Sequence, residues 1–208
     1  MKTEGGPVKD SAPDQGGRKE WAMRITEVTV GPVQTRCYIL SREDGEECLV
    51  IDPGDEAERI RRAAGGKRIA AILLTHGHFD HIGAVGALMG KDTRLAVHSL
   101  DEPMLGNPEL NASFLLPGRR VTAPAPTDRV REGSEMTLAG LKIKVLHTPG
   151  HTPGSVCYLI ENELFTGDTL FDHGWGRTDL PGGNESLMTA SLRRLMPMAR
   201  EIPIHPGH

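Results

Sequence analysis

The segment THGHFDH, residues 75–81, constrains this chain more than any other, because it places four side chains of metal-ligating types within six residues. It follows an apolar run at 69–74 that predicts a strand buried on both faces. A rigid strand can aim the side chains that follow it, and neutral imidazoles and carboxylates bind zinc and similar divalent ions. Four ligands this close together cannot converge on one ion without severe backbone strain. We therefore expect two ions to share a loop at 76–81.

Three further segments supply the ligand types that a two-ion site still lacks. They are HTPGHTPG at 147–154, TGD at 166–168 and PGH at 206–208. The first places a histidine between glycine-proline turns, the second ends a strand pattern with an acid, and the third ends another with a histidine. Because all three follow apolar segments of strand character, these side chains can meet at one edge of a sheet.

Strand patterns dominate from Met23 onward and alternate with a few helical patterns. We expect strands at 23–30, 37–40, 48–51, 69–74, 94–98, 129–146 with a turn at 139–140, 156–160 and 163–166. Helices are predicted at 55–64, from Ile82, and from an N-cap at Asn184 to a stop at Pro197. Long loops are expected at 106–127 and 172–183. This alternation predicts an α+β fold with two sheets and helices packed outside them.

The composition is that of an ordinary globular domain. Of the 208 residues, 38% are hydrophobic and 25% are charged, and no run of about 18 apolar residues could span a membrane. The net charge of −4 disfavours a nucleic-acid binder. The three cysteines form no CxxC motif and lie in apolar strand patterns, which predicts buried free thiols and a cytoplasmic protein.

Residues 1–20 differ from the rest of the chain. They are rich in glycine, proline and charge, and Val8 is their one apolar residue larger than alanine apart from Met1. Such a segment cannot bury enough surface to offset its ordering entropy. We therefore expect a disordered tail at 1–20 and one domain at 21–208.

The motifs THGHFDH, HTPGHTPGS, FTGDTLF, GWGRTDLPGG and HPGH, in that order, resemble those of the metallo-β-lactamase-fold hydrolases. The resemblance is greatest to the glyoxalase-II-like (hydroxyacylglutathione hydrolase-like) branch and extends from about residue 22 to the end. It implies a four-layer αββα sandwich with a dinuclear metal site. The family continues beyond its PGH motif, so the domain is expected to lack its C-terminal end.

The resemblance also implies a set of metal ligands. They are His76, His78 and His151 for one ion, Asp80, His81 and His208 for the other, and Asp168 as a bridge between them. Asp80 and Asp168 would thus take part in catalysis. The ions, most readily Zn²⁺ with iron or manganese as alternatives, would provide a bridging hydroxide as the nucleophile.

The segment GRTDL is the expected substrate region. Glutathione-thioester hydrolases carry a lysine and a tyrosine there, whereas this chain has Arg177 and Asp179. Arg177 either binds a substrate anion or fixes Asp80 or Asp179, or it forms a simple loop ion pair. His173 either contacts substrate or is a loop histidine. The remaining histidines, His98, His147 and His205, are expected to have structural roles.

The sequence therefore predicts a binuclear hydrolase of small thioesters or related esters, without a nucleic-acid or membrane partner. One alternative is a persulfide dioxygenase of the same fold, with a single iron on the equivalents of His76, His151 and Asp168. Such enzymes usually carry an aromatic residue and glutamines where this chain has Leu180-Pro181-Gly182-Gly183, which favours the hydrolase. The other alternative is a metal-binding domain without activity.

Overall fold

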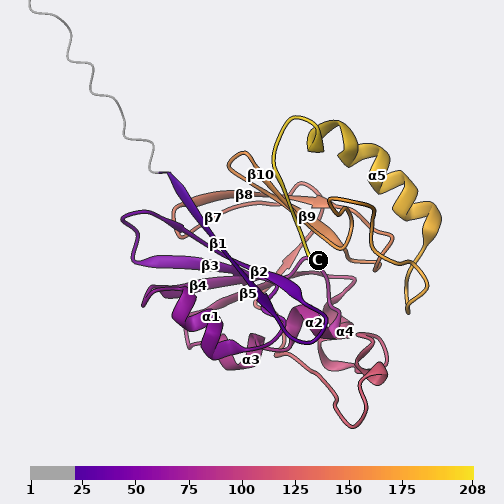
Figure 1. The fold of residues 1–208 in the computed structure, drawn as a ribbon, viewed down its shortest axis with the longest axis horizontal. Coiled ribbons are helices and arrows are strands. Elements are labelled where there is room, and N and C mark those ends of the chain that lie inside the picture. Colours follow the sequence, from indigo (N-terminus) through magenta and orange to yellow (C-terminus); the bar gives the residue numbers. More distant parts are fainter. Residues whose placement is uncertain (1–21) are drawn as a thin grey trace, which may run out of the picture.

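A computed structural model describes residues 22–208 and forms two stacked β-sheets between helices (Figure 1). The tail expected at 1–20 lies outside the described residues. Within them, the first sheet has six strands, in the order β1 (Met23–Val30), β2 (Thr35–Arg42), β3 (Glu47–Ile51), β4 (Arg68–Leu73), β5 (Arg94–His98) and β6 (Asp128–Val130). The second has five, in the order β11 (Ile204–Pro206), β10 (Glu163–Gly167), β9 (Val156–Ile160), β8 (Leu141–His147) and β7 (Glu135–Leu138).

Both sheets mix parallel and antiparallel pairing. Strands β1, β2 and β3 pair in antiparallel fashion, and β3, β4, β5 and β6 continue in parallel. In the second sheet β7, β8, β9 and β10 are antiparallel, and only β11 joins in parallel. The loops that leave β4, β10 and β11 therefore emerge at neighbouring strand ends, where the motifs of the sequence come together.

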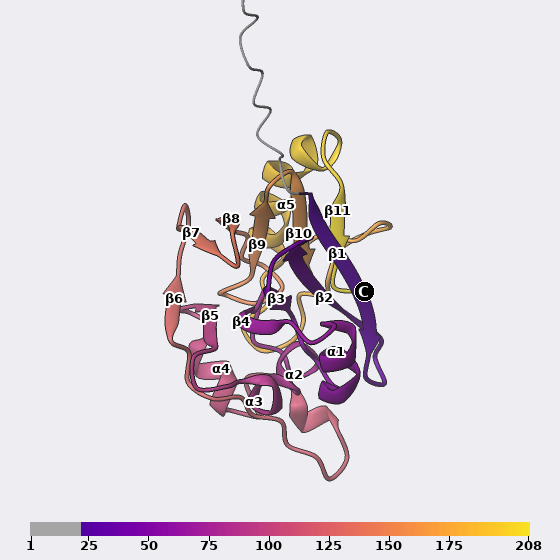
Figure 2. The same cartoon turned by 90° about the vertical axis from the view of Figure 1, so that its left-hand side faces the viewer.

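Helices cover the outer face of each sheet, which gives the four layers that the sequence predicts (Figure 2). Helices α1 (Ala57–Ala63) and α3 (Val85–Leu88) pack on the first sheet, and α5 (Glu185–Ala199) packs on the second. Three short helical segments lie in the loops: α2 (Phe79–Ile82), α4 (Glu102–Gly106) and η1 (Ser113–Leu115). None of the helices in the described part of the chain is long and apolar enough to span a membrane.

The core explains why the strands of the first sheet read as continuous apolar runs. In β2, Tyr38 and Leu40 face the second sheet, whereas Cys37 and Ile39 face the helices. Successive side chains of a strand point to opposite faces, so a strand covered on both sides must be apolar throughout. The three cysteines, Cys37, Cys48 and Cys157, are buried and free, as predicted.

Two local predictions are wrong. The loop expected at 76–81 and the helix expected from Ile82 are both displaced, because α2 begins at Phe79, carries Asp80 and His81 on a helical turn, and ends at Ile82. The second error concerns Pro197, which does not stop α5: the helix continues to Ala199. A proline near the end of a helix removes only one backbone hydrogen bond, and because Arg193 and Pro197 are exposed, water can satisfy the carbonyl left free. The predicted N-cap is confirmed, since the side chain of Asn184 accepts a hydrogen bond from the Leu187 N–H at 2.9 Å.

Candidate metal centre

The seven ligands expected from the sequence lie together at one edge of the two sheets. His76 and His78 lie in the loop after β4, and Asp80 and His81 lie on α2. The others come from the second sheet: His151 from the loop after β8, Asp168 directly after β10, and His208 after β11. Their ligand atoms form three overlapping groups, each within 4.8 Å: His76, His78 and His151; His76, His81 and Asp168; Asp80, His81 and His208.

The first group is a cluster of three buried imidazoles. Nδ1 of His78 lies 2.8 Å from Nε2 of His151. The His76 ring lies 4.8 Å from that of His78 and 4.7 Å from that of His151, measured between ring centroids, and meets both edge to face. All three side chains are almost completely enclosed. We refer to these three residues as the histidine cluster.

Hydrogen bonds at the back of the cluster orient two of its rings. The Thr75 hydroxyl donates to Asp52 Oδ2 at 2.6 Å and can accept from His76 Nδ1 at 3.1 Å. The His151 Nδ1–H donates to the carbonyl oxygen of Arg177 at 2.6 Å. Both patterns assign the proton to Nδ1, which leaves Nε2 of each ring unprotonated and so able to bind a cation.

The third group combines the imidazoles of His81 and His208 with the carboxylate of Asp80. Oδ2 of Asp80 lies 3.2 Å from Nε2 of His208 and 3.5 Å from Nε2 of His81. The same oxygen accepts a hydrogen bond from the Thr35 hydroxyl at 3.2 Å. His208 Nδ1 donates to the carbonyl oxygen of Val33 at 3.1 Å, so its Nε2 also faces the group.

Asp168 belongs to the second group, with His76 and His81, and lies between the histidine cluster and the third group. Its Oδ1 lies 3.5 Å from Nε2 of His81. Its Oδ2 lies 3.5 Å from Nε2 of His151 and 3.6 Å from Nε2 of His208. One carboxylate therefore faces imidazoles of both groups.

Asp52 also supports the site, although the sequence analysis, which ends a strand at residue 51, does not single it out. It is buried and accepts hydrogen bonds from the N–H and hydroxyl of Thr75 at 2.8 and 2.6 Å. Its Oδ2 also lies 3.0 Å from Nδ1 of His81. The sequence did contain an indication of this role. Asp52 directly follows a buried apolar strand, and the same position after a strand was the reason for selecting Asp168 as a candidate ligand.

Burial and neighbouring charge set the protonation states. Burial and the nearby imidazoles, His81 first among them, hold the pKa of His76 well below its ordinary value. Burial, together with His151, does the same for His78. For His81 burial lowers the pKa, but the surrounding carboxylates outweigh it and raise the pKa to about 10. Burial raises the pKa of Asp80, but His81 and the His208 hydrogen bond outweigh it, so this pKa lies well below its usual range.

The residues fit divalent metal ions. Five buried polar atoms at this edge have no hydrogen-bond partner among the described residues: Nε2 of His76 and of His78, both ring nitrogens of His81, and Oδ1 of Asp168. Buried polar atoms without a partner are rare and call for an explanation. Neutral imidazoles mixed with carboxylates form the ligand chemistry of zinc and other borderline divalent ions, so such ions account for the free atoms.

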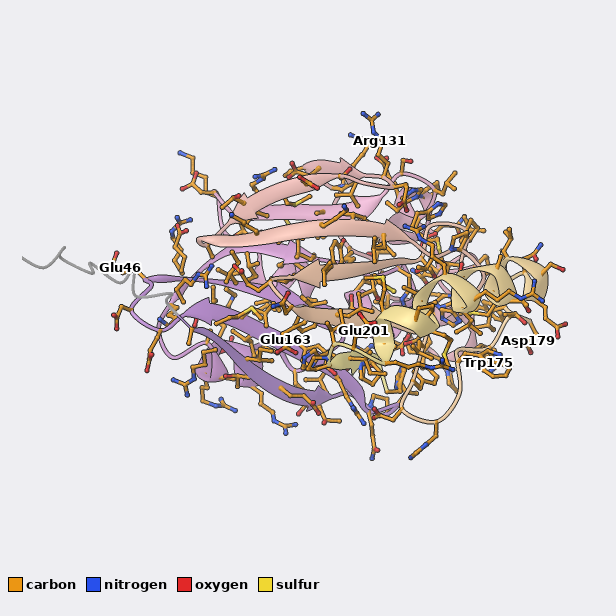
Figure 3. All side chains as sticks on the ribbon, turned by 90° about the horizontal axis from the view of Figure 1, so that it is seen from above. Glu46, Arg131, Glu163, Trp175, Asp179 and Glu201 are labelled. Atoms are coloured by element: carbon orange, nitrogen blue, oxygen red, sulfur yellow. The ribbon has the colours of Figure 1, made fainter. Side chains whose placement is uncertain are left out.

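The expected substrate residues lie at the periphery. Arg177 pairs with Asp179 through two hydrogen bonds of 2.7 Å, which fits both a role in fixing Asp179 and a simple loop ion pair, and Asp179 lies at the margin of the molecule beside α5 (Figure 3). His173 is exposed. Two other histidines have the structural roles predicted for them: His98 stacks on His147 with ring centroids 4.2 Å apart.

The comparisons with known proteins agree with this geometry. The model of the metallo-β-lactamase superfamily matches residues 30–208. The probable metallo-hydrolase YqgX of Bacillus subtilis is 39% identical over 193 residues, which cover 89% of this chain and 90% of the relative. The hydroxyacylglutathione hydrolase GloC of Haemophilus influenzae is 35% identical over 204 residues, which cover 89% of this chain and 91% of GloC.

Solved structures show the same fold. The B3 metallo-β-lactamase BLEG-1 is 36% identical, with a TM-score of 0.82 over 89% of this chain and 91% of the other. TTHA1623, solved in a di-iron-bound form, is 39% identical, with a TM-score of 0.76 over 88% of this chain and 91% of TTHA1623.

Proposed function

Because the chain belongs to the metallo-β-lactamase superfamily, we propose that it is a binuclear metallo-hydrolase that cleaves thioesters or related esters. The observation that carries this proposal is the position of Asp168, whose two carboxylate oxygens face imidazoles of two adjoining ligand groups. A single-ion site needs only one such group. The third group, around Asp80 and His208, favours two ions.

The histidine cluster would hold one ion, and Asp80, His81 and His208 would hold the other, with Asp168 shared. Divalent ions bound there would lower the pKa of a water molecule toward neutrality and so supply hydroxide at neutral pH. We propose Zn²⁺ as the native metal, although the similarity to TTHA1623 makes iron the first alternative to examine.

The chain's own residues fix the geometry of this reaction. The carbonyl oxygen of Arg177 holds the ring of His151, and the Thr35 hydroxyl holds the carboxylate of Asp80. With these contacts in place, Nε2 of His151 faces Asp168, and Oδ2 of Asp80 faces His208. A preorganised site of this kind favours attack on a carbonyl carbon because it needs no rearrangement as charge develops on the oxygen.

The proposal also concerns the thiol from which the thioester substrate is formed. GloC is named a hydroxyacylglutathione hydrolase. In this chain, however, the Arg177 guanidinium donates two hydrogen bonds to the carboxylate of Asp179. Because Arg177 is engaged in this pair, it offers little to a glutathione carboxylate. We therefore expect modest activity on S-lactoylglutathione and equal or better activity on simpler thioesters.

Two measurements test the proposal. Elemental analysis of protein purified without added metal should give two ions per chain, and kcat/KM should be measured for S-lactoylglutathione and for short-chain acyl thioesters of N-acetylcysteamine. One iron per chain, with oxygen uptake on glutathione persulfide, would instead establish the dioxygenase. A kcat/KM near the diffusional ceiling of ~10⁸ M⁻¹s⁻¹ on the glutathione thioester alone would contradict the substrate preference.

A further inference from the structure

Asp101 is a fully buried carboxylate that lies outside the set of expected ligands. It follows β5 and precedes α4, and its side chain makes no capping hydrogen bond to that helix. Its Oδ1 accepts a hydrogen bond from the N–H of Gly154 at 2.6 Å. Its Oδ2 accepts two more, from the N–H of Gly77 at 3.0 Å and from the hydroxyl of Thr152 at 2.6 Å.

These three donors flank the histidine cluster. Gly77 lies between His76 and His78, and Thr152 follows His151 directly. The two segments are far apart in sequence, and the carboxylate of Asp101 links them through space. It therefore fixes both backbones that carry the cluster's rings.

The backbones approach Asp101 too closely for side chains to intervene. A Cβ atom on Gly154 would lie 2.6 Å from Oδ1 of Asp101, and a Cβ atom on Gly77 would lie 2.7 Å from Cβ of Met104. Real Cβ atoms essentially never approach other atoms this closely, so both positions favour glycine. Gly154 thus leaves room for the carboxylate of Asp101, and Gly77 lets its loop approach the start of α4, where Asp101 lies.

A buried carboxylate is costly unless hydrogen bonds compensate for its lost hydration. Asp101 has three, all from donors beside metal-ligand candidates, and an ionised carboxylate acts only as an acceptor. The side chain serves neither the helix that follows it nor an ion pair among the described residues. Its contacts are concentrated on the two loops.

We propose that Asp101 is a positioning residue, which sets the spacing of His78 and His151 by tying their loops together. The inference rests on the proposed function only in that the histidine cluster binds a metal ion. Asp101 does not touch that ion. It acts through the backbone on either side of the ligands.

Substitutions at two positions test this role. Asp101→Asn keeps the size of the side chain, but its amide nitrogen cannot accept a hydrogen bond, so at least one loop contact is lost. Thr152→Val removes one donor at nearly constant shape, and Thr152→Ser retains the hydroxyl. Leu195→Ala, in the core beneath α5, is the control for a general loss of stability.

The readout is Co²⁺ binding to metal-free protein, followed by the visible absorption of the bound ion and by competition with a chelator. We expect Asp101→Asn and Thr152→Val to weaken binding of the first ion by ~10–100-fold and to change the absorption spectrum. Thr152→Ser should restore both, and Leu195→Ala should bind Co²⁺ as the parent protein does.

Parental affinity and spectrum in Asp101→Asn and Thr152→Val would overturn the inference. An equal change in Leu195→Ala would also overturn it, because the effect would then follow from stability alone. If Asp101→Asn does not fold, the pair Thr152→Val and Thr152→Ser decides the matter. A parent protein that binds metal but hydrolyses no thioester would refute the proposed function and leave this test intact.

Discussion

Oδ1 of Asp168 lies 3.5 Å from Nε2 of His81, and neither atom has a hydrogen-bond partner within residues 22–208 although both are buried. The other oxygen of the same carboxylate lies 3.5 Å from Nε2 of His151. A carboxylate can bind two cations at once because it has two oxygens, whereas a histidine offers one nitrogen to a given site. Asp168 is therefore the residue on which the spacing of two ions would depend.

The first prediction compares Asp168→Asn with Asp80→Asn. Both substitutions keep the size of the side chain and remove its charge. Asp80 faces only the group formed with His81 and His208, so its loss affects one ion. We expect Asp168→Asn to lower kcat/KM by at least ~10-fold and by more than Asp80→Asn does, as measured by steady-state kinetics with parallel metal analysis.

If Asp168 had a purely structural role, a different effect of Asp168→Asn on activity would be expected. If this side chain only caps the loop that follows β10, asparagine would replace it with little loss, since asparagine caps equally well. Near-parental activity of Asp168→Asn with two ions bound would therefore exclude a bridging role.

The second prediction concerns His81. This ring is completely buried, and both its nitrogens face carboxylates, with Nδ1 3.0 Å from Asp52 Oδ2. His81→Ala should lower the metal content from two ions toward one and reduce hydrolysis by at least ~10-fold. Elemental analysis and kinetics of the same sample provide the check. Unchanged stoichiometry and rate would rule out the two-ion model.

Much of the site was predictable because each ligand follows a recognisable strand. A buried apolar run before His76 and another before Asp168 predict strand ends, whereas the assignment of each ligand to an ion came from the resemblance to the family. Likewise, the continuous apolar run from Cys37 to Leu40 predicts a strand covered on both faces, as found. These features depend on local sequence and on the two-residue alternation of strands.

The supporting residues were less predictable because their roles depend on tertiary contacts. Asp101 precedes a short helix, a position that an N-cap residue would also occupy, and only the fold brings it to Gly77 and Thr152. Asp52 similarly resembles a strand stop until His81 is placed beside it. The error at Pro197 arose because its effect depends on whether the freed carbonyl reaches water.

The third prediction uses Gly207, which precedes His208. A Cβ atom at this position would lie 2.2 Å from Oδ1 of Asp168 and 3.0 Å from Cε1 of His81. Gly207→Ala must therefore displace the carboxylate, and we expect loss of metal and at least ~10-fold lower activity.

Gly106→Ala is the matched control for that substitution. A Cβ atom at Gly106 would meet no atom within 4 Å, so this variant should keep its metal content and rate. If Gly207→Ala also retains two ions and parental kinetics, the close approach of the backbone to Asp168 is not needed for the site.

The fourth prediction concerns His98, which lies outside the metal centre. Burial and the stacked ring of His147 lower the pKa of His98 to about 4, whereas an unfolded histidine titrates near ~6.5. Between these two values the unfolded chain binds a proton that the folded chain does not. This contribution to stability is thus fully present above pH ~6.5, falls as the pH drops, and is completely lost below pH ~4.

His98→Asn removes the contribution of His98 titration to the free energy of unfolding, because asparagine does not titrate. Its Oδ1 can replace Nδ1 of the ring as the acceptor of the Leu100 N–H. The free energy of unfolding should be measured by urea denaturation between pH 4 and 7.5. In that range the parent should lose stability with falling pH more steeply than the variant, by at most ~1.4 kcal/mol per pH unit, the slope for one proton. Parallel pH profiles, or a His98 resonance that titrates near pH 6.5 by NMR, would show that the stacked pair does not hold His98 neutral.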